Sequence, residues 1–98
     1  MLVRIIKRYR GILAVCDSDL IGKKFEEGKF QLNLEGEFFK GKETSEERVL
    51  KIMQDTAEKD ATFNIVGEKS VSTALKAGII SQNQIKKIQG VPFTLILI

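Results

Sequence analysis

The reactive side chains of this chain limit the chemistry that it can carry out. It has no histidine and one cysteine, Cys16, in 98 residues. Without histidine there is no Ser-His or Cys-His nucleophile pair, no imidazole base and no His-ligated metal site. One thiol cannot complete a cysteine-rich metal site. The sequence therefore predicts no catalytic residues, no metal and no cofactor, and an enzyme that uses Lys, Asp or Glu is the catalytic alternative left open.

The stretch CDSDL, residues 16–20, places the thiol beside two carboxylates, Asp17 and Asp19. An Asp-x-Asp pair resembles part of a calcium loop, but the other ligands of such a loop are missing. Neighbouring negative charge raises the pKa of a thiol, which argues against a reactive thiolate at Cys16. We expect turn-capping acids and a core cysteine.

A single glycine separates a strand-like run from a helix-like run in NIVGEKSV, residues 64–71. The free N–H groups at the start of a helix can bind an anion. The candidate anion-binding residues are Gly67, Glu68, Lys69 and Ser70. Phosphate-binding fingerprints contain several glycines, however, and Glu68 would repel a phosphate. A structural turn is the favoured interpretation, and a small-ligand or anion-binding protein is the alternative.

Positive charge lies at the two ends of the chain. The net charge is +3 over residues 1–30 (seven Lys/Arg, four Asp/Glu), −3 over 31–60 (five and eight) and +3 over 61–98 (four and one). If the ends meet in space, one face could attract nucleic acid, whereas a solvated surface of mixed charge is the commoner arrangement. The candidate nucleic-acid-binding residues are Arg4, Lys7, Arg8, Lys40, Lys86 and Lys87.

The stretch FFKGK, residues 38–42, could stack a base on an aromatic ring and hold a phosphate with a lysine. Because neighbouring strand residues point to opposite faces, one of Phe38 and Phe39 is expected in the core.

Residues 68–88 resemble a helix-turn-helix. Ala74 and Gly78 have the expected spacing, and the two lysines at 86 and 87 could contact phosphates. Gln84 stands where that pattern has an apolar residue, so a helical hairpin is favoured and DNA binding is an alternative.

Hydrophobic periodicity and turn residues predict the elements that position these groups. The expected strands are Leu2–Tyr9, Ile12–Val15, Lys29–Leu34, Glu37–Lys40, Phe63–Val66 and Phe93–Ile98. The expected helices are Thr44–Lys59, with a Thr44/Glu47 capping box, Glu68–Ala77, and a short third helix that Ser81 caps and that carries Ile85 and Ile88.

These elements predict one α+β domain over residues 1–98. Its sheet is mixed and mostly antiparallel, with an N-terminal hairpin region, one long helix and two short helices. The tail, residues 95–98, is apolar at every position, so we expect it inside the sheet or in a homodimer interface. Apolar runs are too short for a membrane span, and the single cysteine fits a reducing compartment, so a cytoplasmic protein is expected.

Four blocks resemble one archaeal family. VCDSDLIGKKFEEGKFQLNL, FFKG, NIVGEKSVSTALKAGII and IQGVP occur here in the order found in the family catalogued as domain of unknown function 424. The resemblance implies an archaeal source, a small single α/β domain and no established activity. Abundant Lys, Glu and Ile without Trp favour a thermophilic source. From the residues we expect a non-catalytic interaction module, with RNA or a ribosome-associated factor as partner.

Overall fold

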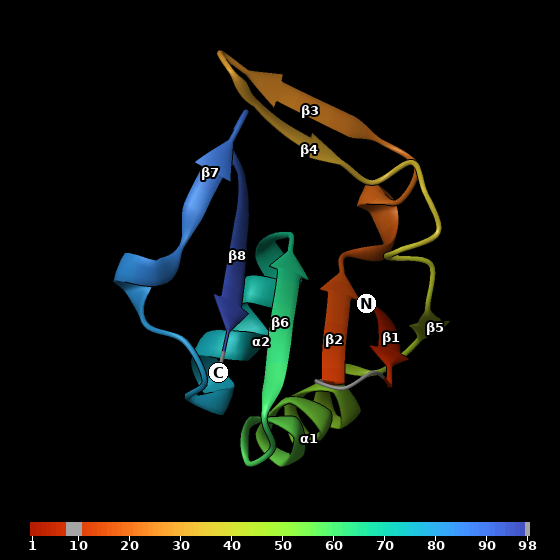
Figure 1. The fold of residues 1–98 in the computed structure, drawn as a ribbon, viewed down its shortest axis with the longest axis vertical. Coiled ribbons are helices and arrows are strands. Elements are labelled where there is room, and N and C mark those ends of the chain that lie inside the picture. The colour runs from red at the N-terminus through yellow and green to blue at the C-terminus, as the bar shows by residue number, and fades with distance from the viewer. Residues whose placement is uncertain (8–10, 98) are drawn as a thin grey trace.

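The computed structural model describes residues 1–7 and 11–97 (Figure 1). Its strands are β1 (Leu2–Ile6), β2 (Gly11–Cys16), β3 (Lys24–Glu27), β4 (Phe30–Asn33), β5 (Lys42–Glu43), β6 (Ala61–Val66), β7 (Lys86–Ile88) and β8 (Val91–Leu97). Its helices are α1 (Glu46–Ala57) and α2 (Glu68–Ala77), with short 3-10 turns at η1 (Ser18–Leu20) and η2 (Gln82–Gln84). Neither α-helix of the described residues is long and apolar enough to cross a membrane.

Six strands form one sheet in the order β5-β1-β2-β6-β8-β7, and β3 pairs with β4 in a separate hairpin. Within the described residues, β2 and β6 are parallel neighbours, and the other pairs are antiparallel. The parallel pair requires a crossover, which α1 provides. The predicted α+β class with a mostly antiparallel sheet is confirmed.

Helix α1 begins one residue later than the predicted cap. Ser45, not Thr44, is the N-cap, and its hydroxyl accepts a hydrogen bond from the backbone N–H of Arg48. Val49 and Met53, four residues apart, are buried on the side that faces the sheet.

The sheet separates two apolar clusters. The larger lies between the sheet and the helices, and its members include Leu13, Val15, Val49, Met53, Phe63, Ile65, Val71 and Ala74. The smaller lies on the opposite face, which we call the distal face, and consists of Ala14, Cys16, Leu34, Phe39 and Val66. The β3–β4 hairpin runs along the top of the sheet from the β2 side to the β7 side (Figure 1).

The prediction of a third helix is wrong. Ser81 does cap a turn, because its N–H donates to Oε1 of Gln84 over 2.8 Å, but the turn stops at η2. Ile85 is already extended, with φ −92° and ψ 129°. Strand β7 then pairs with β8 through a two-residue turn at Gln89 and Gly90, whose φ angles are 50° and 79°. Two positive φ angles are typical of the type I′ turn that joins antiparallel strands.

The predicted strand Glu37–Lys40 is also wrong. The backbone N–H of Lys40 donates to the carbonyl oxygen of Glu37 over 3.0 Å and closes a turn. The strand that pairs with β1 at this edge is β5, two residues further along the chain. The sequence interpretation had also missed β3, which pairs with β4 across a turn at Gly28.

In the order of the sheet β8 lies between β6 and β7, but the described tail residues, 95–97, are paired on one side only. β8 pairs with β6 over Phe93–Leu97 and with β7 over Val91–Phe93. Ile98, Arg8 and Arg10 lie outside the described residues.

Candidate functional site

The parallel strands β2 and β6 end side by side, next to the start of α2. Such paired carboxyl ends are the usual ligand position in α/β sheets. Here the position holds the buried carboxylate of Asp17. Its oxygens accept from the backbone N–H of Lys69 over 3.0 Å, from the N–H of Ser70 over 2.8 Å and from the hydroxyl of Ser70 over 2.7 Å.

Gly67 is the residue that lets Asp17 come so close. Its φ is 108°, in a region that side chains rarely adopt. A Cβ atom added there would lie 2.3 Å from the Cγ of Asp17. The glycine of NIVGEKSV therefore makes room for a carboxylate of the same chain.

The predicted anion-binding residues are thus brought together around Asp17. A cavity of about 220 Å³ adjoins them, and its lining includes Asp17, Asp19, Glu68 and Lys69. An external anion would have to displace Asp17 and would meet two further carboxylates. The anion-binding hypothesis remains a prediction without added support from this geometry.

Cys16 lies in the distal cluster with its thiol directed at the carbonyl oxygen of Asp17, 3.3 Å away. Burial, followed by the charges of Asp17 and Asp19, raises the pKa of this thiol to about 12. A thiol with this pKa stays protonated at neutral pH and is a poor nucleophile and metal ligand.

The predicted basic residues do not form one patch. Arg4 lies on β1 and donates to the carbonyl oxygen of Glu37 over 2.7 Å, whereas Lys86 and Lys87 lie on β7. Four interstrand spacings of about 4.8 Å separate β1 from β7 by roughly 19 Å. Strand alternation also turns Lys86 and Lys87 to opposite faces.

Two other members of this set lie elsewhere. Lys7 borders a cavity with Ile5 and Lys59 at the end of the sheet near α1, and Lys40 pairs with Oε1 of Glu37 over 3.2 Å. Arg8 is outside the described residues. The described residues of the set do not share one face of the molecule. Nucleic-acid binding by the set as a whole stays a prediction.

Phe38 and Phe39 divide as expected, although they lie in a turn. Phe39 is buried in the distal cluster, and Phe38 is 38% exposed. Their rings meet edge to face with centroids 5.0 Å apart. Packing against the ring of Phe39 therefore explains in part why an aromatic residue stands at position 38.

The sequence interpretation missed a groove on the distal face, between the β3–β4 hairpin and β8. We call it the Phe30 groove. Its volume is about 210 Å³, and it is lined by Phe30, Gln84, Lys86, Phe93, Thr94 and Leu95.

Strand register determines which side chains belong to this groove. Phe93 pairs with Val66 of the distal cluster, and Lys86 pairs with Phe93, so all three side chains lie on the distal face. Leu95 follows Phe93 by two residues and shares that face. Thr94 points to the helix side instead, where its hydroxyl has no hydrogen-bond partner among the described residues.

Phe30 contributes to the groove from the hairpin. It lies on the same side of the hairpin as Phe25 and Leu32, which pack against the distal cluster. Phe30 itself is 73% exposed, and Leu95 is 64% exposed. In the single chain Phe30 and Leu95 are therefore both uncovered, because the hairpin passes above the sheet without closing onto β8. The homodimer interface, the second alternative for the tail, stays a prediction.

Comparisons with known proteins agree with the sequence blocks. A solved structure described as an uncharacterized conserved protein from Methanopyrus kandleri superimposes with a TM-score of 0.87 at 26% sequence identity. The match covers 97% of this chain and 88% of that chain. A search of curated proteins gave no match. The family model described as a protein of unknown function (DUF424) matches residues 7–98, and the chain therefore belongs to this family.

Proposed function

We propose that this protein is a non-catalytic interaction module that binds its partner at the Phe30 groove. The observation that carries the proposal is the exposure of Phe30 on the packing side of the β3–β4 hairpin. On that side Phe25 and Leu32 are packed, whereas 73% of Phe30 is exposed in the same groove as Leu95.

The exposed apolar area of this groove favours a partner. Covering a side chain of this size contributes about 1.5–3 kcal/mol. Single exposed apolar residues are normal on a monomer, but large ones gathered in one depression mark interaction sites. Phe30 and Leu95 come from segments 65 residues apart in the chain, so the fold brings them together.

The size and the chemistry of the groove support binding rather than catalysis. Its volume of about 210 Å³ is below the roughly 300–1,000 Å³ of sites that enclose a small molecule. It can receive one group of a larger partner. No carboxylate or thiol of the described residues lines it, so an acid–base pair of that kind is not available there.

The candidate partners are RNA, a ribosome-associated factor, and a second copy of the chain joined along β8. A titration of isotope-labelled protein tests the proposal. Single-stranded RNA, single-stranded DNA and an apolar, acidic peptide are added in turn, and amide chemical shifts are followed. Self-association is measured over a concentration series. We expect one of these to shift amides on β4, β7 and β8.

Two variants make this test specific. Phe30→Ser should weaken the observed binding by about tenfold, as expected for an interface anchor. Ile5→Ser is the matched control, because Ile5 is 56% exposed but lies outside the groove, and it should leave binding unchanged. Shifts confined to other surfaces, or equal affinity in both variants, would overturn the proposal.

A further inference from the structure

Two lysines beside the Phe30 groove lack carboxylate partners. Lys29 is at the tip of the β3–β4 hairpin next to Phe30, and Lys86 is on β7 with its side chain on the distal face. Lys87, the next residue, points to the helix side of the sheet. Among the described residues, neither Lys29 nor Lys86 makes an ion pair, whereas four other lysines do. Those are Lys24, Lys40, Lys51 and Lys76.

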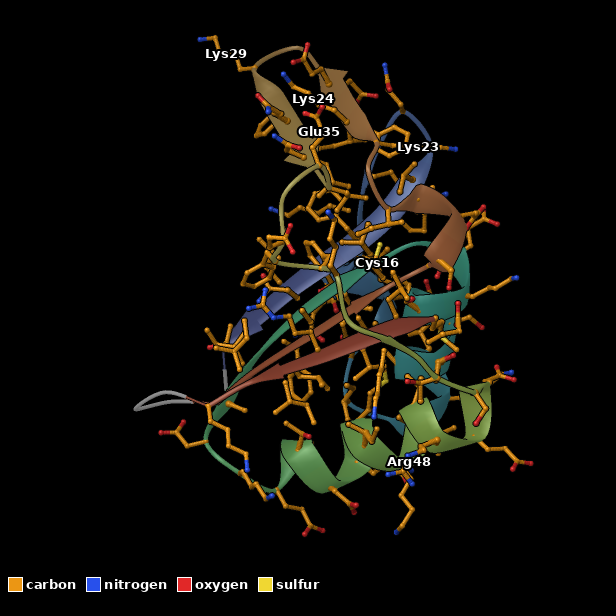
Figure 2. The ribbon with its side chains drawn as sticks, turned by 90° about the vertical axis from the view of Figure 1, so that its right-hand side faces the viewer. Cys16, Lys23, Lys24, Lys29, Glu35 and Arg48 are labelled. Carbon is orange, nitrogen blue, oxygen red and sulfur yellow. The ribbon has the colours of Figure 1, made fainter. Side chains whose placement is uncertain are left out.

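The hairpin tip is held next to β7 by a specific contact. The backbone N–H of Gln89 donates to Oε1 of Glu27 over 3.0 Å. This bond engages a carboxylate beside the groove and brings Lys29 to the edge of the sheet at which Lys86 lies. Figure 2 shows Lys29 at the outer end of the hairpin, directed away from the sheet. This edge therefore offers two free positive charges to an anionic partner on the distal face.

The groove itself supplies the contacts that an unpaired base requires. Phe30 is an exposed aromatic ring, Leu95 is an exposed apolar side chain, and the amide of Gln84 can donate and accept hydrogen bonds. Aromatic stacking next to a cationic track is the common arrangement in proteins that bind single strands. Lys86 connects the groove to the positively charged edge, because its side chain lines the groove and β7 is the edge strand of the sheet.

We infer that the Phe30 groove receives an unpaired base of single-stranded RNA, with the neighbouring phosphates on Lys29 and Lys86. This inference rests on the proposed function and names its partner. Duplex DNA is disfavoured because residues 82–88 form a 3-10 turn and a strand rather than a helix that could enter a major groove. Unpaired bases are exposed in loops and bulges of RNA, whereas a base of duplex DNA must first be flipped out.

Fluorescence anisotropy with labelled, unstructured RNA of about eight nucleotides tests the inference, since this length is within the usual site size. Two neutralised phosphates predict a slope of about −1.4 for log K against log salt concentration. Lys86→Ala should reduce the size of this slope by about 0.7, whereas Lys87→Ala should leave it unchanged, because Lys87 points to the opposite face. Lys59→Ala is the matched control, because Lys59 is exposed near α1 and away from the groove.

Stacking is tested by two substitutions at one position. Phe30→Ser should weaken RNA binding by about tenfold or more, whereas Phe30→Tyr, which keeps the ring, should stay within about twofold. The unfolding midpoint should change little in both variants, because Phe30 is 73% exposed.

The other outcomes separate this inference from the proposed function. If the peptide or a second copy shifts the groove amides and RNA does not, RNA as the partner is wrong and the interaction module stands. Binding of duplex RNA as tightly as single-stranded RNA would overturn base insertion. If no partner shifts the groove amides, both proposals are wrong.

Discussion

At the scale of single residues, the contact between Gly67 and Asp17 explains why a glycine stands at the strand-to-helix turn. Phosphate-binding turns use glycine so that a ligand can approach the backbone. Here the group that approaches is the carboxylate of Asp17, contributed by the segment after β2. The sequence predicted the turn and its exposed N–H groups, but not their partner, because Asp17 and Gly67 are 50 residues apart.

Replacement of Gly67 by alanine should destabilise the protein by at least about 1–3 kcal/mol. The native φ of 108° is strained for any side chain, and the new Cβ would collide with Asp17. Urea unfolding measures the change in the free energy of unfolding. Gly36→Ala is the control, because nothing lies within 4 Å of a Cβ there, and it should be close to neutral. Equal stability of the two variants would contradict this account of Gly67.

Removal of the Asp17 carboxylate should expose an anion site that the wild-type protein fills by itself. Asp17→Ala frees the N–H groups of Lys69 and Ser70 and should cost about 1.5–3 kcal/mol. Sulfate or phosphate should then raise the unfolding midpoint of this variant more than that of the wild type, because the start of α2 attracts anions.

Asp19→Ala is the control for that experiment, since Asp19 is exposed and accepts no hydrogen bond from α2. Phosphate that stabilises the wild type as much as Asp17→Ala would show that anions bind elsewhere or beside Asp17. Amide shifts of Lys69 and Ser70 distinguish these two cases.

At the scale of elements, the sequence predicted best where local and global signals agree. Helices α1 and α2 combine acidic first turns with apolar side chains on one face, and both were predicted. Residues 82–88 carry conflicting signals: the cap at Ser81 favours a helix, whereas pairing with β8, which the local sequence does not reveal, favours a strand. The pairing of Lys86–Ile88 with Val91–Phe93 decides the outcome, and Gln89-Gly90 is a weak local signal for it, because the usual type I′ turn has Asn or Asp before the glycine.

The turn between β7 and β8 leads to a prediction at this scale. Gln89 has a φ of 50°, a conformation in which asparagine is less strained than other side chains. Gln89→Asn should therefore stabilise the protein by about 0.5 kcal/mol. Only the backbone N–H of Gln89 is used by Glu27, so that contact is retained.

Thermal unfolding tests this change against Gln82→Asn, which is exposed in η2 and has no positive φ. The control should be neutral or slightly destabilising. A lower midpoint for Gln89→Asn than for the control would show that the turn does not prefer the left-handed conformation.

At the scale of the whole molecule, the two faces of the sheet differ in how completely they are covered. Helices α1 and α2 bury one face, and the hairpin with the turn at Phe39 covers part of the other. The tail looked uniformly apolar in sequence, which predicted burial on both sides. The exposure of Leu95 depends on how far the hairpin reaches, and no local pattern encodes that distance. This explains why the sequence predicted the strand but missed the groove.

Deletion of residues 95–98 tests what the tail does for the fold. β8 pairs Leu95, Ile96 and Leu97 with Asn64, Phe63 and Thr62 of β6. Loss of these residues would leave one edge of β6 unpaired beside Phe63, a fully buried side chain of the larger cluster. An unpaired apolar edge recruits other chains, so the truncated protein should aggregate or lose cooperative unfolding.

The substitution Leu95→Ser separates the backbone role of the tail from its side chain in the groove. Because Leu95 is 64% exposed, this variant should keep its unfolding midpoint while it loses affinity at the Phe30 groove. Gel filtration and denaturant unfolding of both proteins compare the effects. A truncated chain that stays soluble, monomeric and cooperatively folded would contradict this prediction. It would show that the sheet is stable without the pairing of residues 95–97 with β6.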